Sequence, residues 1–232
     1  MAKLALVGYG KMGKMIDSLA PEYGFETVLR LDEFNNVDGA GMTREHFAGV
    51  DVAIEFTTPH TAVENIGRLA ALGVSTVVGT TGWTAQLDHV REIVARSGIG
   101  FVWSPNFSIG VNVFNRVVAE AARLLANEPS YGAWAWEIHH NTKKDAPSGT
   151  LIQLVDRMQS AGYARHIDIS SNRAGAHPGT HEIGFDSAAD TITLRHAARS
   201  REGFARGSLK AAQWLVETKK KGCFDFTEVL FG

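Results

Sequence analysis

The sequence is poor in cysteine and contains no long apolar run. Its single cysteine, Cys223, excludes an internal disulfide, a cysteine-rich zinc site and an iron–sulfur cluster, and it favours a reducing compartment. No window approaches the roughly 20 apolar residues of a membrane-spanning helix. The apolar run at the N-terminus is too short for a signal peptide. We therefore expect a cytoplasmic protein without a membrane partner.

An excess of charge of one sign is also missing. The chain has 23 lysines and arginines against 25 aspartates and glutamates, a net charge of -2 at pH 7. This balance gives no reason to expect nucleic acid or an anionic membrane surface as a partner. With 232 residues, 44% of them hydrophobic, the chain suits one large globular domain or two small ones.

Strand and helix patterns alternate in the first part of the chain. Strands are predicted over residues 3–7, 25–31, 51–57, 74–79 and 99–104, with helical patterns among them. Such alternation is typical of βαβ units, in which helices cover both faces of a parallel sheet. The sequence therefore predicts an α/β fold with a Rossmann-like parallel sheet.

The pattern changes after Phe107. A long helix is predicted over 109–126, and closely spaced alternating strands follow over 131–140, 180–186 and 191–197. These strands favour a mixed sheet in a second, α+β domain. We expect a dinucleotide-binding domain from residues 1–107 with 208–232, and a domain for substrate binding and assembly from 108–207.

A glycine turn, "GYGKMG", follows the first strand and opens a helix. Gly8 permits the tight turn, Gly10 lets a pyrophosphate approach, and Gly13 lets helix and strand pack closely. The helix N-terminus favours an anion. The pattern predicts cofactor contacts from Gly8, Tyr9, Gly10, Lys11, Met12 and Gly13. The alternative is a glycine-rich turn that binds nothing.

An acidic pair ends the second strand. Asp32 lies about 20 positions beyond the glycine turn, where a carboxylate normally bonds the adenosine ribose. The next residue, Glu33, adds a charge that repels the ribose phosphate of NADP, although Lys11 and Arg30 could partly offset this repulsion. We expect NADH to be preferred and leave NADPH use open.

Two further segments follow predicted strands, at the sheet edge where ligands bind in open α/β folds. They are "GTTG" and "SPNF". They add as expected cofactor contacts Gly79, Thr80, Thr81, Ser104, Pro105, Asn106 and Phe107.

The segment "HHNTKKDAPSGT", His139–Thr150, carries an unusual density of polar groups. Alternation along the preceding strand puts Glu137 and His139 on one face and His140 on the other. Glu137 could therefore orient His139 as a general acid or base. Lys143 follows four residues after His139.

A helix is expected to begin near the end of this segment, with Pro147 in its first turn. Gly149 and Thr150 would then lie at a helix N-terminus, which is an anion site. Together with Lys143 and His139, this arrangement indicates a small carboxylated substrate that gains a proton along with a hydride.

Other interpretations of this segment remain. The lysines could belong to a solvated loop, and the "SGT" sequence could be only a helix cap. Adjacent histidines lack the usual i, i+4 spacing and further ligands, so we predict no metal site. No tyrosine has a lysine four residues later, which sets aside a short-chain dehydrogenase.

The stretch "EIHHNTKKDAPSGT" is similar to the H-H-x-x-K-x-D-A-P-S-G-T signature of the dihydrodipicolinate reductase family, and the resemblance extends to "GTTG", "NFSIGVN" and "SREGFARGSLKAAQWL". It implies reduction of 4-hydroxy-tetrahydrodipicolinate to tetrahydrodipicolinate by NADH or NADPH, on the diaminopimelate route to lysine. It also implies a C-terminal segment that completes the Rossmann-like domain, and a homotetramer.

The resemblance also implies roles for single residues. His139 corresponds to the catalytic proton donor, and Lys143 to a second proton donor and substrate anchor. His140, Gly149 and Thr150 correspond to substrate-binding positions. Two departures from the family pattern are Lys11, where arginine is usual, and Glu33, where many members carry a basic residue. The remaining alternatives are another two-domain NAD-dependent dehydrogenase, and a non-catalytic sensor that binds NADH without turnover.

Overall fold

The computed structural model describes all residues from 1 to 232, and the chain divides into two compact units. The first contains Met1–Ile109 and Glu202–Gly232, and the second contains Gly110–Arg201. The chain returns to the first unit at Glu202, six residues before the predicted boundary. The reason is that the whole of helix α6, Glu202–Thr218, packs on the first sheet.

The first unit is built on a six-stranded sheet in the order β10-β5-β4-β3-β1-β2, in which every pair is parallel. The strands are β1 Ala2–Val7, β2 Phe25–Leu31, β3 Val52–Glu55, β4 Ser75–Val78, β5 Gly100–Trp103 and β10 Gly222–Asp225. The helices are α1 Lys11–Leu19, α2 Pro59–Ala71, α3 Leu87–Ser97, α6 and α7 Phe226–Phe231. Short 3-10 turns occur at Ala20–Tyr23, Val37–Gly39 and Thr84–Gln86.

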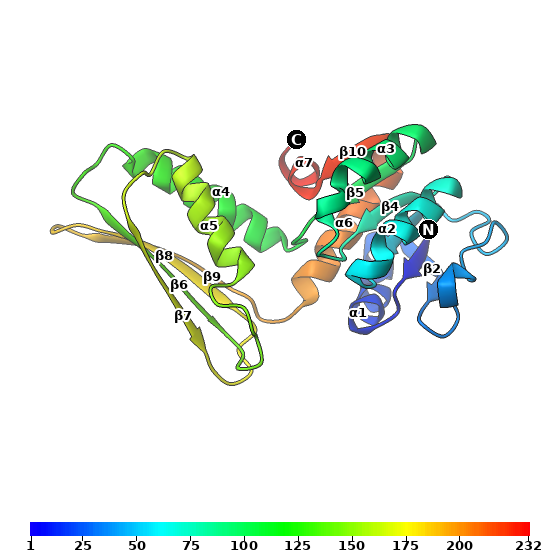
Figure 1. The fold of residues 1–232 in the computed structure, drawn as a ribbon, viewed down its shortest axis with the longest axis horizontal. Coiled ribbons are helices and arrows are strands. Elements are labelled where there is room, and N and C mark those ends of the chain that lie inside the picture. Colours follow the sequence, from blue (N-terminus) through cyan, green and yellow to red (C-terminus); the bar gives the residue numbers. More distant parts are fainter. The chain divides into compact units, whose positions relative to one another are not determined.

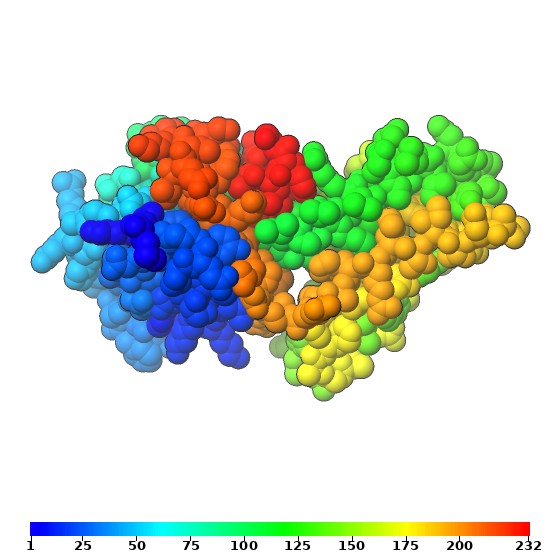
Figure 2. Space-filling view, turned by 180° about the vertical axis from the view of Figure 1, so that it is seen from behind, coloured from blue at the N-terminus to red at the C-terminus, as the bar shows by residue number.

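Helices cover both faces of this sheet, as the apolar strand sequences require. One face packs against α1 and α6, and the other against α2 and α3 (Figure 1). Figure 2 shows the C-terminal residues of the unit, in orange and red, directly against its blue N-terminal residues. The C-terminal segment thus contributes a strand and two helices to the unit that begins the chain.

The second unit is a four-stranded mixed sheet in the order β7-β6-β8-β9. Its strands are β6 Gly132–His139, β7 Ile167–Arg173, β8 Thr180–Asp186 and β9 Thr191–Ala197. Helices α4, Ile109–Leu125, and α5, Gly149–Ser160, pack on one face (Figure 1). Their shared core includes Phe114, Leu154 and Phe185. The opposite face has no helix over it and carries Trp134, Trp136 and Ile138.

The predicted fold class is confirmed: a parallel, Rossmann-like sheet and a separate mixed sheet. One strand of the mixed sheet, β7, was not predicted, because "IDISSNR" has few apolar residues and lies at the sheet edge, where one side needs no burial. None of the helices is both long and apolar enough to span a bilayer.

Candidate functional site

The glycine turn joins β1 to α1 in the manner that its spacing predicts. Gly8 has φ +102°, and a Cβ there would lie 2.0 Å from the carbonyl oxygen of Phe56. A Cβ on Gly13 would lie 2.3 Å from the carbonyl oxygen of Gly8. A Cβ on Gly10 would meet nothing within 4 Å. Gly8 and Gly13 are therefore required for packing, whereas Gly10 leaves open space in front of the helix start.

Helix α1 begins at Lys11 without a side-chain cap. Its first amide groups lack intrahelical acceptors, so they can bind a phosphate. Two hollows meet at Gly10, at the carboxyl edge of the sheet. The larger, of about 820 Å³, is lined by Gly8, Tyr9, Gly10 and Asp32, among others. The smaller, of about 430 Å³, is lined by Lys11, Met12, Gly79, Thr80 and Thr81, among others. The structure thus brings most of the predicted cofactor residues together, and they fit a dinucleotide.

Asp32 has one oxygen engaged and one free. Its Oδ1 accepts the backbone N–H groups of Phe34 at 2.9 Å and Asn35 at 3.1 Å, which fixes the turn after β2. Oδ2 accepts no hydrogen bond and is available to a ribose. Phe34, which lines the larger hollow, is 82% exposed and offers a flat apolar surface beside Asp32.

The charges around the larger hollow differ from those expected. The expected cation Arg30 does not line it, because its guanidinium bonds Asp17 at 2.7 and 2.9 Å. Lys11 lines the smaller hollow instead. The lining cations are Lys14 and Arg68, and Arg68 is held by Glu64 at 2.5 Å. The lining carboxylates are Asp32, Glu33, Asp38 and Glu64. Negative charge therefore prevails where an adenosine ribose would bind.

Ser104–Phe107 lines neither hollow. The Ser104 hydroxyl closes a turn, donating to the Asn106 carbonyl at 2.9 Å and accepting the Asn106 N–H at 3.1 Å. Phe107 is buried against Phe226, with ring centroids 4.8 Å apart. Packing thus accounts for Ser104 and Phe107, whereas Pro105 is exposed.

In the second unit, Glu137 lies fully buried at the centre of a hydrogen-bond network. Its Oε1 accepts the Ser148 N–H at 2.9 Å, the Ser171 hydroxyl at 3.0 Å and the Arg173 guanidinium at 2.9 Å. Its Oε2 accepts the Ser148 hydroxyl. Burial acts to raise the pKa of Glu137, but the bonds from Ser148 and Arg173 outweigh it and lower the pKa. Glu137 is therefore a buried anion with its charge compensated.

His139 lies on the same face of β6 as Glu137, as the alternation predicts. Its Nδ1 is 3.4 Å from Glu137 Oε2 and has no hydrogen-bond partner. His181 Nε2 lies 3.4 Å from the same oxygen, and the two imidazole rings meet edge to face with centroids 5.0 Å apart. Burial lowers the pKa of His139, while Glu137 acts in the opposite direction. Burial also lowers the pKa of His181, to about 4. Both imidazoles are therefore mostly neutral at pH 7.

Glu137, His139 and His181 form the one cluster of side chains that could hold a metal ion, with ligand atoms within 4.8 Å of one another. Glu137, however, already accepts four hydrogen bonds, and Arg173 supplies the positive charge that a metal would bring. These donors favour a proton-handling network over a metal centre.

The polar segment after β6 contacts this network through Ser148 and through the carbonyl of Asp145, which accepts a bond from Arg173. Lys143 Nζ bonds both oxygens of Asp145, at 2.7 and 2.8 Å, whereas Lys144 is exposed and forms no ion pair. His140 Nδ1 lies 2.7 Å from the Thr142 hydroxyl. Lys143 is therefore held in an ion pair that Lys144 lacks, and the roles of both lysines and of His140 stay predictions.

The helix after this segment begins within one residue of the predicted start, but Pro147 lies outside it. Ser148 is the N-cap of α5, accepting the Leu151 N–H at 3.2 Å, so Pro147 lies before the helix and not in its first turn. The predicted position of Pro147 was wrong because the serine side chain caps more effectively than the preceding alanine. Gly149 and Thr150 are the first two residues of α5, where an anion can bind.

Sequence reasoning missed Ser171, Arg173, Gly179 and His181. Ser171 of β7 and His181 of β8 both pair with Glu137 across the sheet, and Arg173 pairs with His139. A Cβ on Gly179 would lie 2.9 Å from His139 Nε2. Only the strand register brings these residues to the site, and the local sequence does not encode that register.

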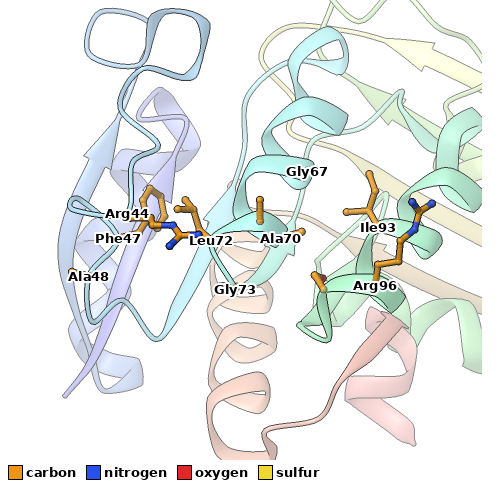
Figure 3. A pocket seen from close by; sticks show the side chains of 11 residues that line it. Arg44, Phe47, Ala48, Gly67, Ala70, Leu72, Gly73, Ile93 and Arg96 are labelled. Carbon is orange, nitrogen blue, oxygen red and sulfur yellow. The ribbon is translucent and has the colours of Figure 1, made fainter.

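A separate groove of about 760 Å³ lies in the first unit, between residues 44–48 and the C-terminal ends of α2 and α3 (Figure 3). Its lining includes the cations Arg44 and Arg96 and the apolar side chains of Ala70 and Leu72. The lining residues precede β3, β4 and β5, so the groove is at the amino edge of the sheet. Nucleotides bind at the carboxyl edge, and this groove is therefore not the cofactor site.

The comparisons with known proteins agree with this geometry. The family model of the dihydrodipicolinate reductase N-terminus matches residues 2–107, and that of the C-terminus matches 110–230. The 4-hydroxy-tetrahydrodipicolinate reductase of Christiangramia forsetii is 34% identical and covers 98% of this chain and 97% of its own. That of Methanoregula boonei is 38% identical, over 78% of this chain and 74% of its own.

Solved structures show the same fold. The dipicolinate-bound dihydrodipicolinate reductase of Paenisporosarcina sp. TG-14 has a TM-score of 0.80 at 23% identity and covers 97% of both chains. An engineered D-amino acid dehydrogenase bound to NADP+ has a TM-score of 0.59 at 14% identity, over 98% of this chain and 93% of that one. At these identities the likeness extends to the fold alone.

The nucleotide hollows and the buried histidine network define a two-domain oxidoreductase that binds a pyridine nucleotide. Within that class, the chain belongs to the dihydrodipicolinate reductase family. The predicted family and enzyme class are confirmed.

Proposed function

We propose that the protein reduces 4-hydroxy-tetrahydrodipicolinate to tetrahydrodipicolinate with NADH, using His139 and Lys143 as proton donors. The observation that carries the proposal is a buried imidazole, held beside a compensated carboxylate, next to a lysine and a helix N-terminus. A family member bound to dipicolinate supports a dicarboxylate as the ligand.

The substrate carboxylates need positive groups. Lys143 supplies one, and the amides and hydroxyl at Gly149 and Thr150 supply a site of the kind that binds anions. Asp145 holds Lys143 in the free protein. A substrate carboxylate replaces this partner without leaving the ammonium group unpaired, and His140 adds a further donor at the edge of the site.

The reaction takes up one hydride and one proton and releases the 4-hydroxyl group as water. When bound, the reduced nicotinamide supplies the hydride. His139 is mostly neutral at pH 7 because burial lowers its pKa. A dianion bound nearby favours the imidazolium form, so substrate binding raises the pKa of His139 and loads the proton that the reaction consumes. Glu137, whose Oε2 lies 3.4 Å from His139 Nδ1, stabilises the imidazolium.

NADH is the preferred coenzyme in this proposal. The hollow that accepts the adenosine half is lined by more carboxylates than cations, and these repel a ribose phosphate. Of the two lining cations, Arg68 is neutralised by Glu64, which leaves Lys14 against Asp32, Glu33 and Asp38. NADPH is therefore the weaker coenzyme. The Ser104–Phe107 segment, which lines neither hollow, has no role in this proposal.

A homotetramer is the proposed assembly, through residues 110–201, in the cytoplasm. The uncovered sheet face carries Trp134, Trp136 and Ile138, and this combination of aromatic and aliphatic side chains is enriched in interfaces.

Oxidation of NADH and of NADPH, with 4-hydroxy-tetrahydrodipicolinate generated in situ, tests the proposal. We expect turnover with both coenzymes, a higher kcat/KM with NADH, and inhibition by dipicolinate. NADH binding without turnover would indicate a sensor instead, and turnover of a different substrate would indicate another dehydrogenase.

A further inference from the structure

Glu55, the last residue of β3, is a buried carboxyl group that the reaction does not use. Its exposed fraction is 0%. It directly precedes Phe56 and Thr57, which line both nucleotide hollows. The rest of β3 is the apolar sequence Val-Ala-Ile. An acidic side chain at such a place is rarely fully buried unless a cation accompanies it.

The hydrogen bonds of Glu55 connect two loops of the cofactor site. Its Oε1 accepts the Thr57 hydroxyl and, at 3.4 Å, the Asn65 amide. Asn65 also donates to the Thr57 hydroxyl oxygen at 3.2 Å. The Thr57 N–H in turn donates to the Thr80 hydroxyl at 2.7 Å. Glu55 therefore lies at the base of a chain of bonds from the loop after β3 to the loop after β4.

No cation compensates Glu55. Its other oxygen, Oε2, is buried and accepts no hydrogen bond. None of the titratable groups on the elements packed around β3 forms an ion pair with Glu55. These groups are Lys3 on β1, Lys11, Lys14 and Asp17 on α1, His60, Glu64 and Arg68 on α2, and Glu202, Arg206, Lys210 and Glu217 on α6. β4 and the Gly79–Thr81 loop contain no titratable side chain. Burial raises the pKa of Glu55, and the polar groups of Thr57, Thr80 and Asn65 oppose this only in part.

We infer that Glu55 is an uncharged positioning residue that holds the two nucleotide-binding loops together, and that its ionisation weakens dinucleotide binding. A pyrophosphate at Gly10 and Lys11 is anionic, and a carboxylate buried beneath the same hollows would repel it through a medium of low dielectric constant. The neutral acid keeps its bond from Thr57 without this repulsion. The inference rests on the family's use of a pyridine nucleotide and is independent of the proposed substrate.

The change Glu55→Gln provides the test, because glutamine has nearly the shape of the protonated acid and cannot ionise. NADH affinity would be measured by fluorescence titration between about pH 5.5 and pH 9. At the acid end we expect the variant to match wild type within about twofold. Above the pKa of Glu55, wild-type affinity should fall by up to about tenfold per pH unit, while the variant stays flat. Glu92→Gln, which removes an exposed carboxylate of α3, should follow wild type.

Thermal unfolding gives a second readout. Folding raises the pKa of Glu55 above its unfolded value of 4.5. The contribution of this group to the stability of the folded protein is therefore full below pH 4.5 and is lost as the pH rises through the folded pKa. The Tm of Glu55→Gln should therefore exceed that of wild type increasingly towards alkaline pH, and the gap should close in acid. A gap independent of pH would overturn the inference.

Two other results would also contradict it. In the first, Glu55→Gln binds NADH about tenfold more weakly than wild type at acid pH although its Tm equals that of wild type. In the second, the NADH affinities of the variant and of wild type coincide up to about pH 9. If the variant does not fold, calorimetry on wild type replaces it. Over the pH range in which Glu55 titrates, NADH binding should take up a fraction of a proton, seen by comparing buffers of different ionisation enthalpy. Since these readouts require no substrate, failure here leaves the proposed reaction intact.

Discussion

Gly179 offers a direct way to move His139 without changing its chemistry. It is buried, has φ +136°, and lies where a Cβ would be 2.9 Å from His139 Nε2 and 3.0 Å from Cδ2. In Gly179→Ala the imidazole must retreat by about 0.5 Å to reach ordinary van der Waals contact. The alanine must also adopt a backbone conformation that costs about 1–3 kcal/mol.

A second glycine separates these two effects. Gly162 has φ +99°, and a Cβ there would meet only the Ala126 Cβ, at an ordinary 3.8 Å. Gly162→Ala therefore introduces backbone strain without touching His139. We expect both variants to lose stability in thermal unfolding. Only Gly179→Ala should also lose kcat, by about tenfold to a hundredfold, the cost of displacing a catalytic group by a fraction of an ångström to one ångström. Equal kcat values for the two variants would refute a role for His139 Nε2 in the reaction.

Two further predictions concern the same site. Lys143→Ala should weaken dipicolinate binding by about tenfold or more in calorimetry, because a charge-assisted bond is lost, whereas the exposed neighbour Lys144→Ala should stay within about twofold. Equal losses would remove the distinction between the lysines. Glu137→Gln should destabilise the protein at neutral pH by at most about 3–5 kcal/mol, since it breaks a buried pair with Arg173. The pKa of Glu137 is lowered on folding, so its contribution is present above the unfolded value, 4.5, and is lost as the pH falls through the folded value. Chemical denaturation of both proteins across the acid range should show the gap narrowing, and a constant gap would contradict the ionised state of Glu137.

The sequence was a reliable guide wherever function depends on local pattern. The glycine spacing places Gly8, Gly10 and Gly13 by backbone geometry alone, and the structure has the close contacts that this spacing implies. Strand alternation put Glu137 and His139 on one face for the same reason. Lys143 was distinguished from Lys144 by the family signature, and this choice stays a prediction.

The sequence did not predict the features that depend on long-range pairing between strands. His181 reaches Glu137 through the antiparallel register of β6 and β8, and Ser171 through the parallel register of β6 and β7. Neither register is written in a local motif. Arg30 looked available to the cofactor in the sequence, but Asp17, on the neighbouring helix, binds it instead. The cofactor contacts of Ser104–Phe107 stay a prediction: the Ser104 hydroxyl closes a turn and Phe107 packs in the core.

The change His139→Gln tests the central claim most directly, that this imidazole supplies the reaction's proton. Steady-state kinetics with 4-hydroxy-tetrahydrodipicolinate would be compared with NADH binding measured separately. We predict that kcat falls by about a hundredfold or more, the usual contribution of a general acid, while the NADH dissociation constant changes by less than about twofold. Unchanged turnover in a variant that binds NADH normally would contradict the account.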